Sequence, residues 1–167
     1  MNILTINIFC NIWYIKMIFV CGNQLILAKE VKGMTDWIWN GDVIADVEKA
    51  TLIFTFKNNS DQPMLIEFPT SQFYDYKVYN AQGEQVYHFS TRKFFLQVIQ
   101  NKSLNSGEQI QWKSTWNYKT NDGGSSPAGT YTVNAILEIW KINDKLVNPK
   151  PATSFTFNIP PKKTTIR

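Results

Sequence analysis

Apolar and polar residues alternate along the chain from residue 50 onward, with a period of two. Leu52, Phe54 and Phe56 share one side of the first run, while Thr55 and Lys57 fall on the other. Because successive side chains of a strand point to opposite faces of a sheet, this pattern predicts a strand with one buried face. Further runs of this kind cover residues 64–68, 74–78, 85–89, 94–99, 109–116, 129–139 and 155–159.

Turn-forming residues separate these runs. Residues 58–61 read Asn-Asn-Ser-Asp, and residues 80–83 end in Gly83, which can supply the positive φ that a hairpin loop needs. The polar stretch 101–108 and the Gly- and Ser-rich stretch 119–128 are further loops. The chain therefore predicts an all-β fold, an immunoglobulin-like antiparallel β-sandwich of about seven or eight strands. A closed barrel is the alternative, because strand order cannot be read from one sequence.

The tryptophans of this region fit such a sandwich. Trp112 and Trp116 lie on the apolar face of their run, which favours a place in the core over a ligand-stacking role. Trp37 and Trp39 precede the first clear strand and would form either an edge strand or a lid over one end of the sandwich. Trp140 falls on the polar side of its run, where it would be exposed or cover a sheet edge.

Composition narrows the possible chemistry. The chain of 167 residues is 14% aromatic, so large rings must fill its core. One histidine and two cysteines are too few for a zinc site, an iron–sulfur cluster or a Cys–His nucleophile pair, so we expect no metal and no cofactor. The net charge is only +4 and no run of five basic residues occurs, so nucleic acid is not an expected partner. We expect no small-molecule substrate either.

Residues 1–33 differ from the rest of the chain. They hold both cysteines, Cys10 and Cys21, and Lys16 divides their apolar stretch into uncharged pieces of 15 and 12 residues, too short for a spanning helix. The codons of residues 29–33 can contain a purine-rich ribosome-binding sequence just before the Met34 codon. We therefore expect residues 1–33 to be a mis-assigned, translated leader and residues 34–167 to be the domain, with a signal or anchor as the alternative. A cysteine-free domain suits the reducing cytoplasm of a bacterium.

Candidate catalytic residues are few. His88 is the only histidine and no nucleophile motif such as Gly-x-Ser-x-Gly accompanies it, so a structural or surface role is expected. Glu67 and Asp75 are the nearest pair of acids for glycosidase-like chemistry, but nothing in the sequence sets the spacing that such chemistry needs. The sequence indicates no enzyme.

Residues 68–78 and 83–90 carry a distinctive pattern. A Phe-Pro pair, a Gln, a Tyr-Asp-Tyr run and a Val are followed by a glycine turn and a second run of Val, aromatic residues and Ser. In this pattern the sequence resembles the intracellular proteinase inhibitor family, known as the BsuPI domain, and the similarity extends over about residues 50–137. The motif positions are Phe68, Gln72, Tyr74, Asp75, Val78, Gly83, Val86 and Ser90.

The resemblance implies a small intracellular β-sandwich that inhibits serine proteases, chiefly of the subtilisin type. A reversible inhibitor presents an exposed segment to the protease cleft and buries about 800 Å² per partner. We expect residues 90–94 to be this segment, with residues 119–127 as a longer and more flexible alternative. Phe94 would enter an apolar specificity pocket, or Arg92 the pocket of a trypsin-like enzyme. The predicted protease-binding residues are Ser90, Thr91, Arg92, Lys93 and Phe94.

A second function is open at this point. Many immunoglobulin-like domains are non-inhibitory interaction modules, secreted or envelope-associated, because a fold alone does not fix a function. A genuine signal or membrane anchor within residues 1–33 would favour that alternative.

Overall fold

The computed structural model describes residues 19–21, 24–26 and 36–162. The chain divides into two units, Met1–Thr35 and Asp36–Arg167. In the first unit, β1 (Phe19–Cys21) pairs with β2 (Gln24–Ile26) in an antiparallel manner. The remainder of the predicted leader lies outside the described residues. Within the described ranges, no helix is long and apolar enough to cross a membrane.

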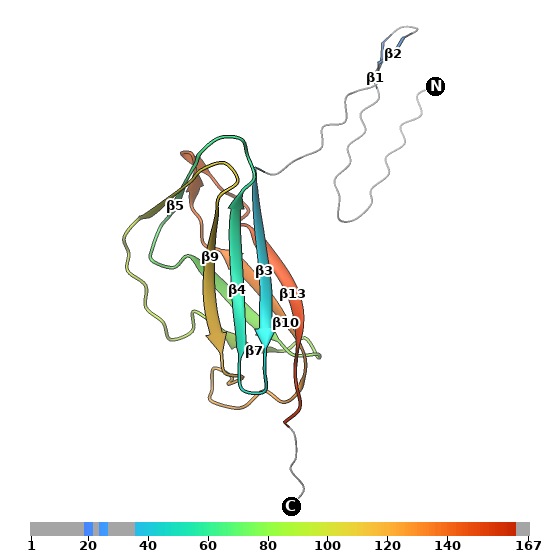
Figure 1. The fold of residues 1–167 in the computed structure, drawn as a ribbon, viewed down its shortest axis with the longest axis vertical. Coiled ribbons are helices and arrows are strands. Elements are labelled where there is room, and N and C mark those ends of the chain that lie inside the picture. The colour runs from blue at the N-terminus through green and yellow to red at the C-terminus, as the bar shows by residue number, and fades with distance from the viewer. Residues whose placement is uncertain (1–18, 22–23, 27–35, 163–167) are drawn as a thin grey trace, which may run out of the picture. The chain divides into compact units, whose positions relative to one another are not determined.

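The second unit contains eleven strands in three antiparallel sheets (Figure 1). The first sheet has the order β3 (Trp37–Ala45), β4 (Ala50–Asn58), β9 (Gln109–Trp116). The second has the order β13 (Ala152–Ile159), β10 (Gly129–Leu137), β6 (Tyr74–Tyr79), β7 (Gln85–His88). The third has the order β12 (Lys145–Leu146), β11 (Lys141–Ile142), β5 (Met64–Phe68), β8 (Gln100–Leu104).

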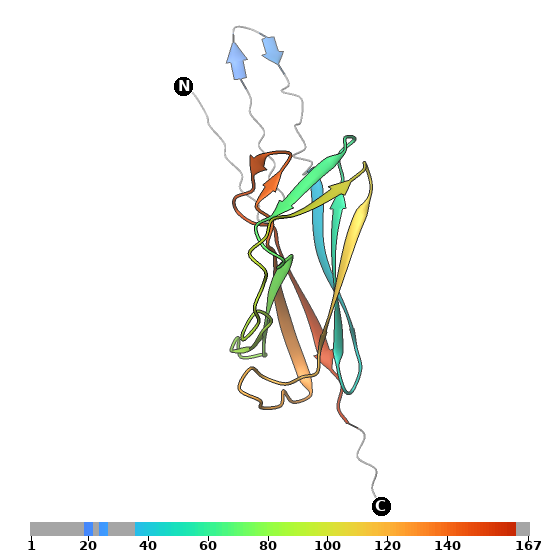
Figure 2. The ribbon, with the colours of Figure 1, turned by 90° about the vertical axis from the view of Figure 1, so that its left-hand side faces the viewer.

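The first and second sheets form the two layers of a sandwich, with the third sheet at one end (Figure 2). Each sheet has two end strands, so the described strands do not close into a barrel. The predicted all-β antiparallel sandwich is confirmed, whereas its immunoglobulin-like topology stays a prediction. The short strands β11 and β12 account for part of the difference between eleven strands and the predicted seven or eight.

Alternation along β4 builds the centre of the core. Leu52, Phe54 and Phe56 are fully buried between the layers. The Phe54 ring lies 4.9 Å from the Tyr74 ring and 5.5 Å from the Tyr76 ring, measured between centroids, so aromatic contacts join the first sheet to the second. The predicted burial of Trp116 is also confirmed, since it is 1% exposed.

Trp37 and Trp39 belong to β3, the edge strand of the first sheet, so the edge-strand alternative is the correct one. Beside it lies β13 of the second sheet. At Gly41 the two strands come so close that a Cβ atom would lie 2.0 Å from Cε1 of Phe155. The absent side chain of Gly41 lets the Phe155 ring close this side of the sandwich.

Two predictions about the region after β7 are wrong. Residues 94–99 form no strand, and the predicted polar loop 101–108 contains most of β8. β8 pairs along its whole length with β5, from Gln100 opposite Phe68 to Leu104 opposite Met64. Because backbone pairing stabilises this edge strand and only Leu104 is buried, its side chains carry no apolar alternation.

A buried asparagine fixes the end of β4. Asn58 is fully buried, and its side-chain amide donates to the carbonyl oxygens of Gln62, Leu104 and Asn105 at 2.7, 3.2 and 3.1 Å. Its Oδ1 accepts from the Ser60 hydroxyl at 2.7 Å. One side chain thus satisfies the polar groups of the turn after β4 and of the turn after β8.

Candidate functional site

The connection between β7 and β8 carries large apolar side chains on its surface. It is the loop that arches away from the sheets in Figure 1. Phe94 is 99% exposed and Leu96 is 70% exposed, with Val98 and Ile99 each more than half exposed. We call residues 94–99 the apolar segment. Because these side chains remain in water and bury little apolar surface within the fold, the apolar segment is the candidate interaction surface of the described residues.

The residues before the apolar segment form a turn. The Thr91 N–H donates to the His88 carbonyl at 3.2 Å, and the Lys93 N–H donates to the Ser90 carbonyl at 3.0 Å. Arg92 has a φ of 62°, in the left-handed region. The predicted segment 90–94 is therefore a turn that ends at an exposed phenylalanine, not an extended strand along its whole length.

The side chain of Lys93 lies over the ring of Phe89, the residue directly after β7. Its ammonium lies 3.2 Å from the centroid of the Phe89 ring, a cation–π contact. Burial lowers the pKa of Lys93, while the nearby Asp75 carboxylate raises it. This contact attaches the exposed Lys93 to Phe89, a partly buried residue that packs against the core.

The apolar segment has a second point of attachment at Leu96. The Leu96 N–H donates to Ser71 Oγ at 2.9 Å, and the Ser71 N–H donates to the Leu96 carbonyl at 3.0 Å. Phe94 and Phe95 therefore lie between two attached positions, the turn that ends at Lys93 and the pair of hydrogen bonds at Leu96. Two tie points so close together restrict the conformations available to the two phenylalanines.

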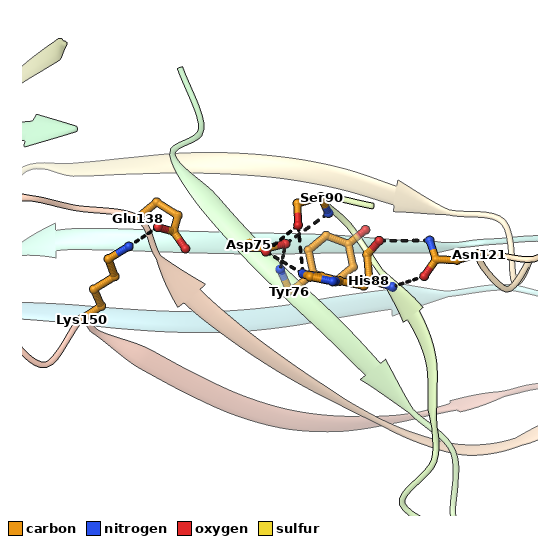
Figure 3. Close-up of polar contacts among 7 residues, drawn as sticks. All are labelled: Asp75, Tyr76, His88, Ser90, Asn121, Glu138 and Lys150. Atoms are coloured by element: carbon orange, nitrogen blue, oxygen red, sulfur yellow. Dashed lines mark hydrogen bonds and ion pairs between the residues drawn. The ribbon is translucent and has the colours of Figure 1, made fainter. Parts of the chain in front are cut away.

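Three polar side chains meet beneath the turn (Figure 3). His88 Nε2 lies 2.7 Å from Asp75 Oδ2 and 2.9 Å from Ser90 Oγ, and Ser90 Oγ donates to Asp75 Oδ2 at 2.8 Å. The other carboxylate oxygen of Asp75 accepts from the N–H of Tyr76 at 2.8 Å. These contacts join β6 to the first residues after β7.

The arrangement of Ser90, His88 and Asp75 is not a catalytic triad. A triad needs the hydroxyl on one imidazole nitrogen and the carboxylate on the other. Here both groups contact Nε2, and the serine hydroxyl also donates to the aspartate directly. The three groups form a closed triangle of contacts that leaves the hydroxyl unactivated.

The sequence carries only part of the signal for this cluster, because it depends on the register of the β6–β7 hairpin. In the β6–β7 hairpin, Lys77 faces His88. Two further steps along both strands bring Asp75 opposite Ser90. A β-bulge between Val78 and Tyr79 shifts this register by one residue from the register beside the loop, where Tyr79 faces Gln85, so the predicted hairpin alone would have placed Asp75 opposite Phe89.

Asn121 connects the second predicted loop to the same place. Its Oδ1 accepts from the His88 N–H at 2.6 Å, and its Nδ2 donates to the His88 carbonyl at 3.1 Å (Figure 3). The sequence offered residues 90–94 and 119–127 as alternatives. The structure brings both loops together at the end of β7.

Most of the other motif residues serve the fold. Phe68 and Val78 are fully buried, and Gly83 has a φ of 80° in the hairpin loop, as its position predicts. The half-buried members that pack against the core are Tyr74 and Val86. Gln72 lies in the connection between β5 and β6, where its N–H donates to Thr70 Oγ1 at 3.0 Å. In the part of the chain that the structure describes, no three His, Cys, Asp or Glu side chains gather as a metal site requires.

A family model identifies the chain. The model of the intracellular proteinase inhibitors, BsuPI, matches residues 37–141, well over half of the sequence. The chain belongs to the BsuPI family. Members of a family of proteinase inhibitors are not enzymes, which agrees with the unactivated serine. The BsuPI match includes the motif residues, the turn, the apolar segment and Asn121.

Two solved structures show a distant likeness to this BsuPI chain. One is beta-glucosidase 3B from Thermotoga neapolitana in complex with glucose, with 14% identity, a TM-score of 0.40 and coverage of 78% of this chain. Another is Spo0M, a sporulation control protein from Bacillus subtilis, with 11% identity, a TM-score of 0.39 and the same coverage of 78%. The chain spans 16% and 51% of the lengths of these two proteins. No curated protein matches it.

Proposed function

We propose that this BsuPI protein reversibly inhibits a serine protease of the subtilisin type by placing the loop around Phe94 in the protease cleft. The observation that carries the proposal is the 99% exposure of the Phe94 side chain. Moving a phenyl ring from water into an apolar specificity pocket contributes about 1.5–3 kcal/mol. Such a ring is the kind of anchor residue that dominates protein–protein binding.

The tie points on either side of Phe94 support the same function. A loop that is flexible in the free inhibitor must lose conformational entropy when it binds, and this loss weakens affinity. The bonds of Lys93 to Ser90 and of Leu96 to Ser71 remove part of that cost in advance.

The remaining predicted contact residues surround this anchor. Ser90 and Lys93 shape the turn, and Thr91 and Arg92 are exposed on it. Arg92 is the alternative anchor, for a trypsin-like protease with an acidic pocket. Leu96 and the following apolar side chains extend the contact surface beyond Phe94.

Titration of the full chain against a subtilisin-type protease tests the proposal, with a trypsin-like protease run in parallel. We expect inhibition of the first enzyme, and an inhibition constant that rises by about 30-fold or more for Phe94→Ala. Arg92→Ala should have a smaller effect on that enzyme. Ile44→Ala is the matched control, since Ile44 is 66% exposed but lies on β3, and its inhibition constant should match that of the wild type.

Two results would contradict the proposal. Absence of inhibition at micromolar concentration would exclude the function itself. Equal inhibition constants for the wild type, Phe94→Ala and Arg92→Ala would exclude residues 90–94 as the contact loop. Inhibition of the trypsin-like enzyme alone, lost in Arg92→Ala, would replace Phe94 by Arg92 as the anchor.

We also propose that the inhibitory domain is residues 34–167, that residues 1–33 are a leader, and that the protein acts in the cytoplasm. The support is the ribosome-binding pattern that the codons before Met34 can hold, together with the location in the family's description. Mass spectrometry of the N-terminus of the native protein tests this. A peptide from residues 3–16 would overturn the leader.

A further inference from the structure

The side chain of Asn121 occupies the free edge of β7. It accepts from the N–H of His88 at 2.6 Å and donates to the carbonyl of His88 at 3.1 Å. A neighbouring strand would make this same pair of bonds with the backbone of one residue. A single amide side chain therefore stands in for a strand at the last residue of β7 (Figure 3).

His88 connects Asn121 to the turn before the apolar segment. Its carbonyl oxygen accepts from both Asn121 Nδ2 and the Thr91 N–H, at 3.1 and 3.2 Å. Its imidazole contacts Ser90 Oγ at 2.9 Å, and the Ser90 carbonyl in turn accepts from the Lys93 N–H at 3.0 Å. His88 thus contributes two of the contacts that fix the turn, beside the bonds of Ser90 to Asp75 and the contact of Lys93 with the Phe89 ring.

The loop that carries Asn121 has its own support. The Thr120 N–H donates to the Gly124 carbonyl at 3.0 Å, the Gly123 N–H donates to the Thr120 carbonyl at 3.1 Å, and the Thr120 hydroxyl bonds to Asp122. The indole N–H of Trp116 donates to the Lys119 carbonyl at 2.7 Å. Since these bonds do not involve the Asn121 side chain, the loop keeps its shape when that side chain is removed.

We propose that Asn121 is a positioning residue of the inhibitor, which holds the turn at residues 90–93 and thereby presents Phe94 without touching the protease. This inference rests on the proposed function. It also gives the loop at residues 119–127 a role that differs from the one predicted, since the loop supports the contact segment instead of competing with it. Without Asn121, the turn gains conformations that must be lost again on binding.

The experiment compares Asn121→Ala with Asn80→Ala in the full chain. Asn80 is a matched control because its Oδ1 also accepts from two backbone N–H groups, those of Gln82 and Glu84 at 3.1 and 2.9 Å, at the opposite end of the β6–β7 hairpin. The measurements are the inhibition constant against the subtilisin-type protease and the hydrogen-exchange rates of the Thr91 and Lys93 amides. The melting temperature of each variant controls for loss of the fold.

For Asn121→Ala we expect an inhibition constant about tenfold higher, which corresponds to about 1.4 kcal/mol, and faster exchange of both amides. Asn80→Ala should leave the inhibition constant and both exchange rates within about twofold of the wild type. Asn121→Asp keeps the acceptor for the His88 N–H but lacks the donor, so its inhibition constant should fall between those of the wild type and Asn121→Ala.

Other outcomes overturn the inference in distinguishable ways. Weaker inhibition with unchanged exchange would make Asn121 a direct contact of the protease. Faster exchange with unchanged inhibition would exclude a positioning role in binding. A wild-type chain that does not inhibit would refute the proposed function, while the exchange rates would still decide whether Asn121 orders the turn, with unchanged rates refuting that too.

Discussion

Two stretches of this chain look alike in sequence and differ completely in the folded protein. In β4, Leu52, Phe54 and Phe56 are fully buried. In the apolar segment, Phe94 and Leu96 are largely exposed, although the residues are just as apolar. The difference teaches that apolar residues at strand spacing predict a strand only where a neighbouring strand is available.

Backbone pairing explains why the two stretches differ. β4 lies between β3 and β9 and pairs with both along its length. The apolar segment accepts one backbone hydrogen bond, from the Ser71 N–H to the Leu96 carbonyl, while the Leu96 N–H donates to the Ser71 side-chain hydroxyl. A segment of this kind gains little stability from its own apolar side chains, so the binding of a partner offers a physical reason for their presence.

The largest effect that the comparison predicts is for Phe54→Ala. Removing this fully buried ring leaves a cavity between the two layers, so the free energy of unfolding should fall by about 4 kcal/mol. Urea denaturation measures it. A loss below about 1 kcal/mol would mean that the aromatic contacts of β4 do not hold the layers together.

The next effect concerns the end of β4. Asn58→Ala removes the donor that serves three carbonyl oxygens and the acceptor of the Ser60 hydroxyl, so the free energy of unfolding should fall by about 3 kcal/mol. Asn59→Ala is the neighbouring control, because its side chain takes no part in these bonds. Equal effects of both variants on urea denaturation would show that the turn, and not the buried amide, fixes this end of the strand.

A smaller loss of stability is expected from removing the hydroxyl of Tyr76, whose ring packs beside Phe54. Tyr76 Oη lies 3.0 Å from Ser114 Oγ in the core. Tyr76→Phe leaves the serine hydroxyl without this partner and should lower the free energy of unfolding at neutral pH by about 1 kcal/mol.

The same tyrosine makes stability depend on alkaline pH. Burial raises the pKa of Tyr76, so the folded state keeps its phenolic proton after the unfolded chain has lost it. The contribution of Tyr76 to the free energy of unfolding should therefore be fully present below pH 10 and be lost as the pH rises beyond about 10. Tyr76→Phe should reduce this alkaline loss, and equal slopes for wild type and variant in urea titrations between pH 9 and about 11 would contradict the assignment.

The smallest effect on stability completes the comparison. Phe94→Ala removes the same side chain as Phe54→Ala, but from a position in water, so the free energy of unfolding should change by less than about 0.5 kcal/mol. The variant thus separates binding from folding, since its inhibition constant is expected to change strongly. A loss of more than about 2 kcal/mol would show that the ring packs against the fold in solution.

Much of the fold could be predicted from the sequence because burial on one face of a strand leaves a period of two. This signal gave β4, β9 and β10, and the glycine at position 83 gave the β6–β7 hairpin. β8 was not predicted because backbone pairing with β5 stabilises it and only its last side chain is buried, so its sequence shows no apolar alternation. β11 and β12 have two residues each, too few to show any period.

The candidate site was predictable only in part. Phe94 is exposed because no strand in the described ranges pairs with the segment that carries it. Whether a strand lies beside a segment depends on the packing of residues distant in sequence, which a local pattern does not show. Asn121 and His88 are far apart in sequence, and their contact leaves no local pattern. The contact between Asp75 and Ser90 depends on a β-bulge between Val78 and Tyr79, which shifts the register of the β6–β7 hairpin by one residue and leaves no sign in the alternation of apolar residues.

Both outer strands of the second sheet are shielded, and this has a consequence for self-association. A strand at the edge of a sheet offers its backbone to other chains and can seed fibrils. At β7 the outward N–H and C=O of His88 are already bonded to Asn121, and at β13 the ring of Phe155 lies against Gly41 of the adjacent β3. A second copy that approaches this sheet finds the β7 backbone engaged at His88 and the β13 side covered by another strand. The contacts at these two edges thus limit strand pairing between copies of the second sheet, while the apolar segment stays exposed to solvent.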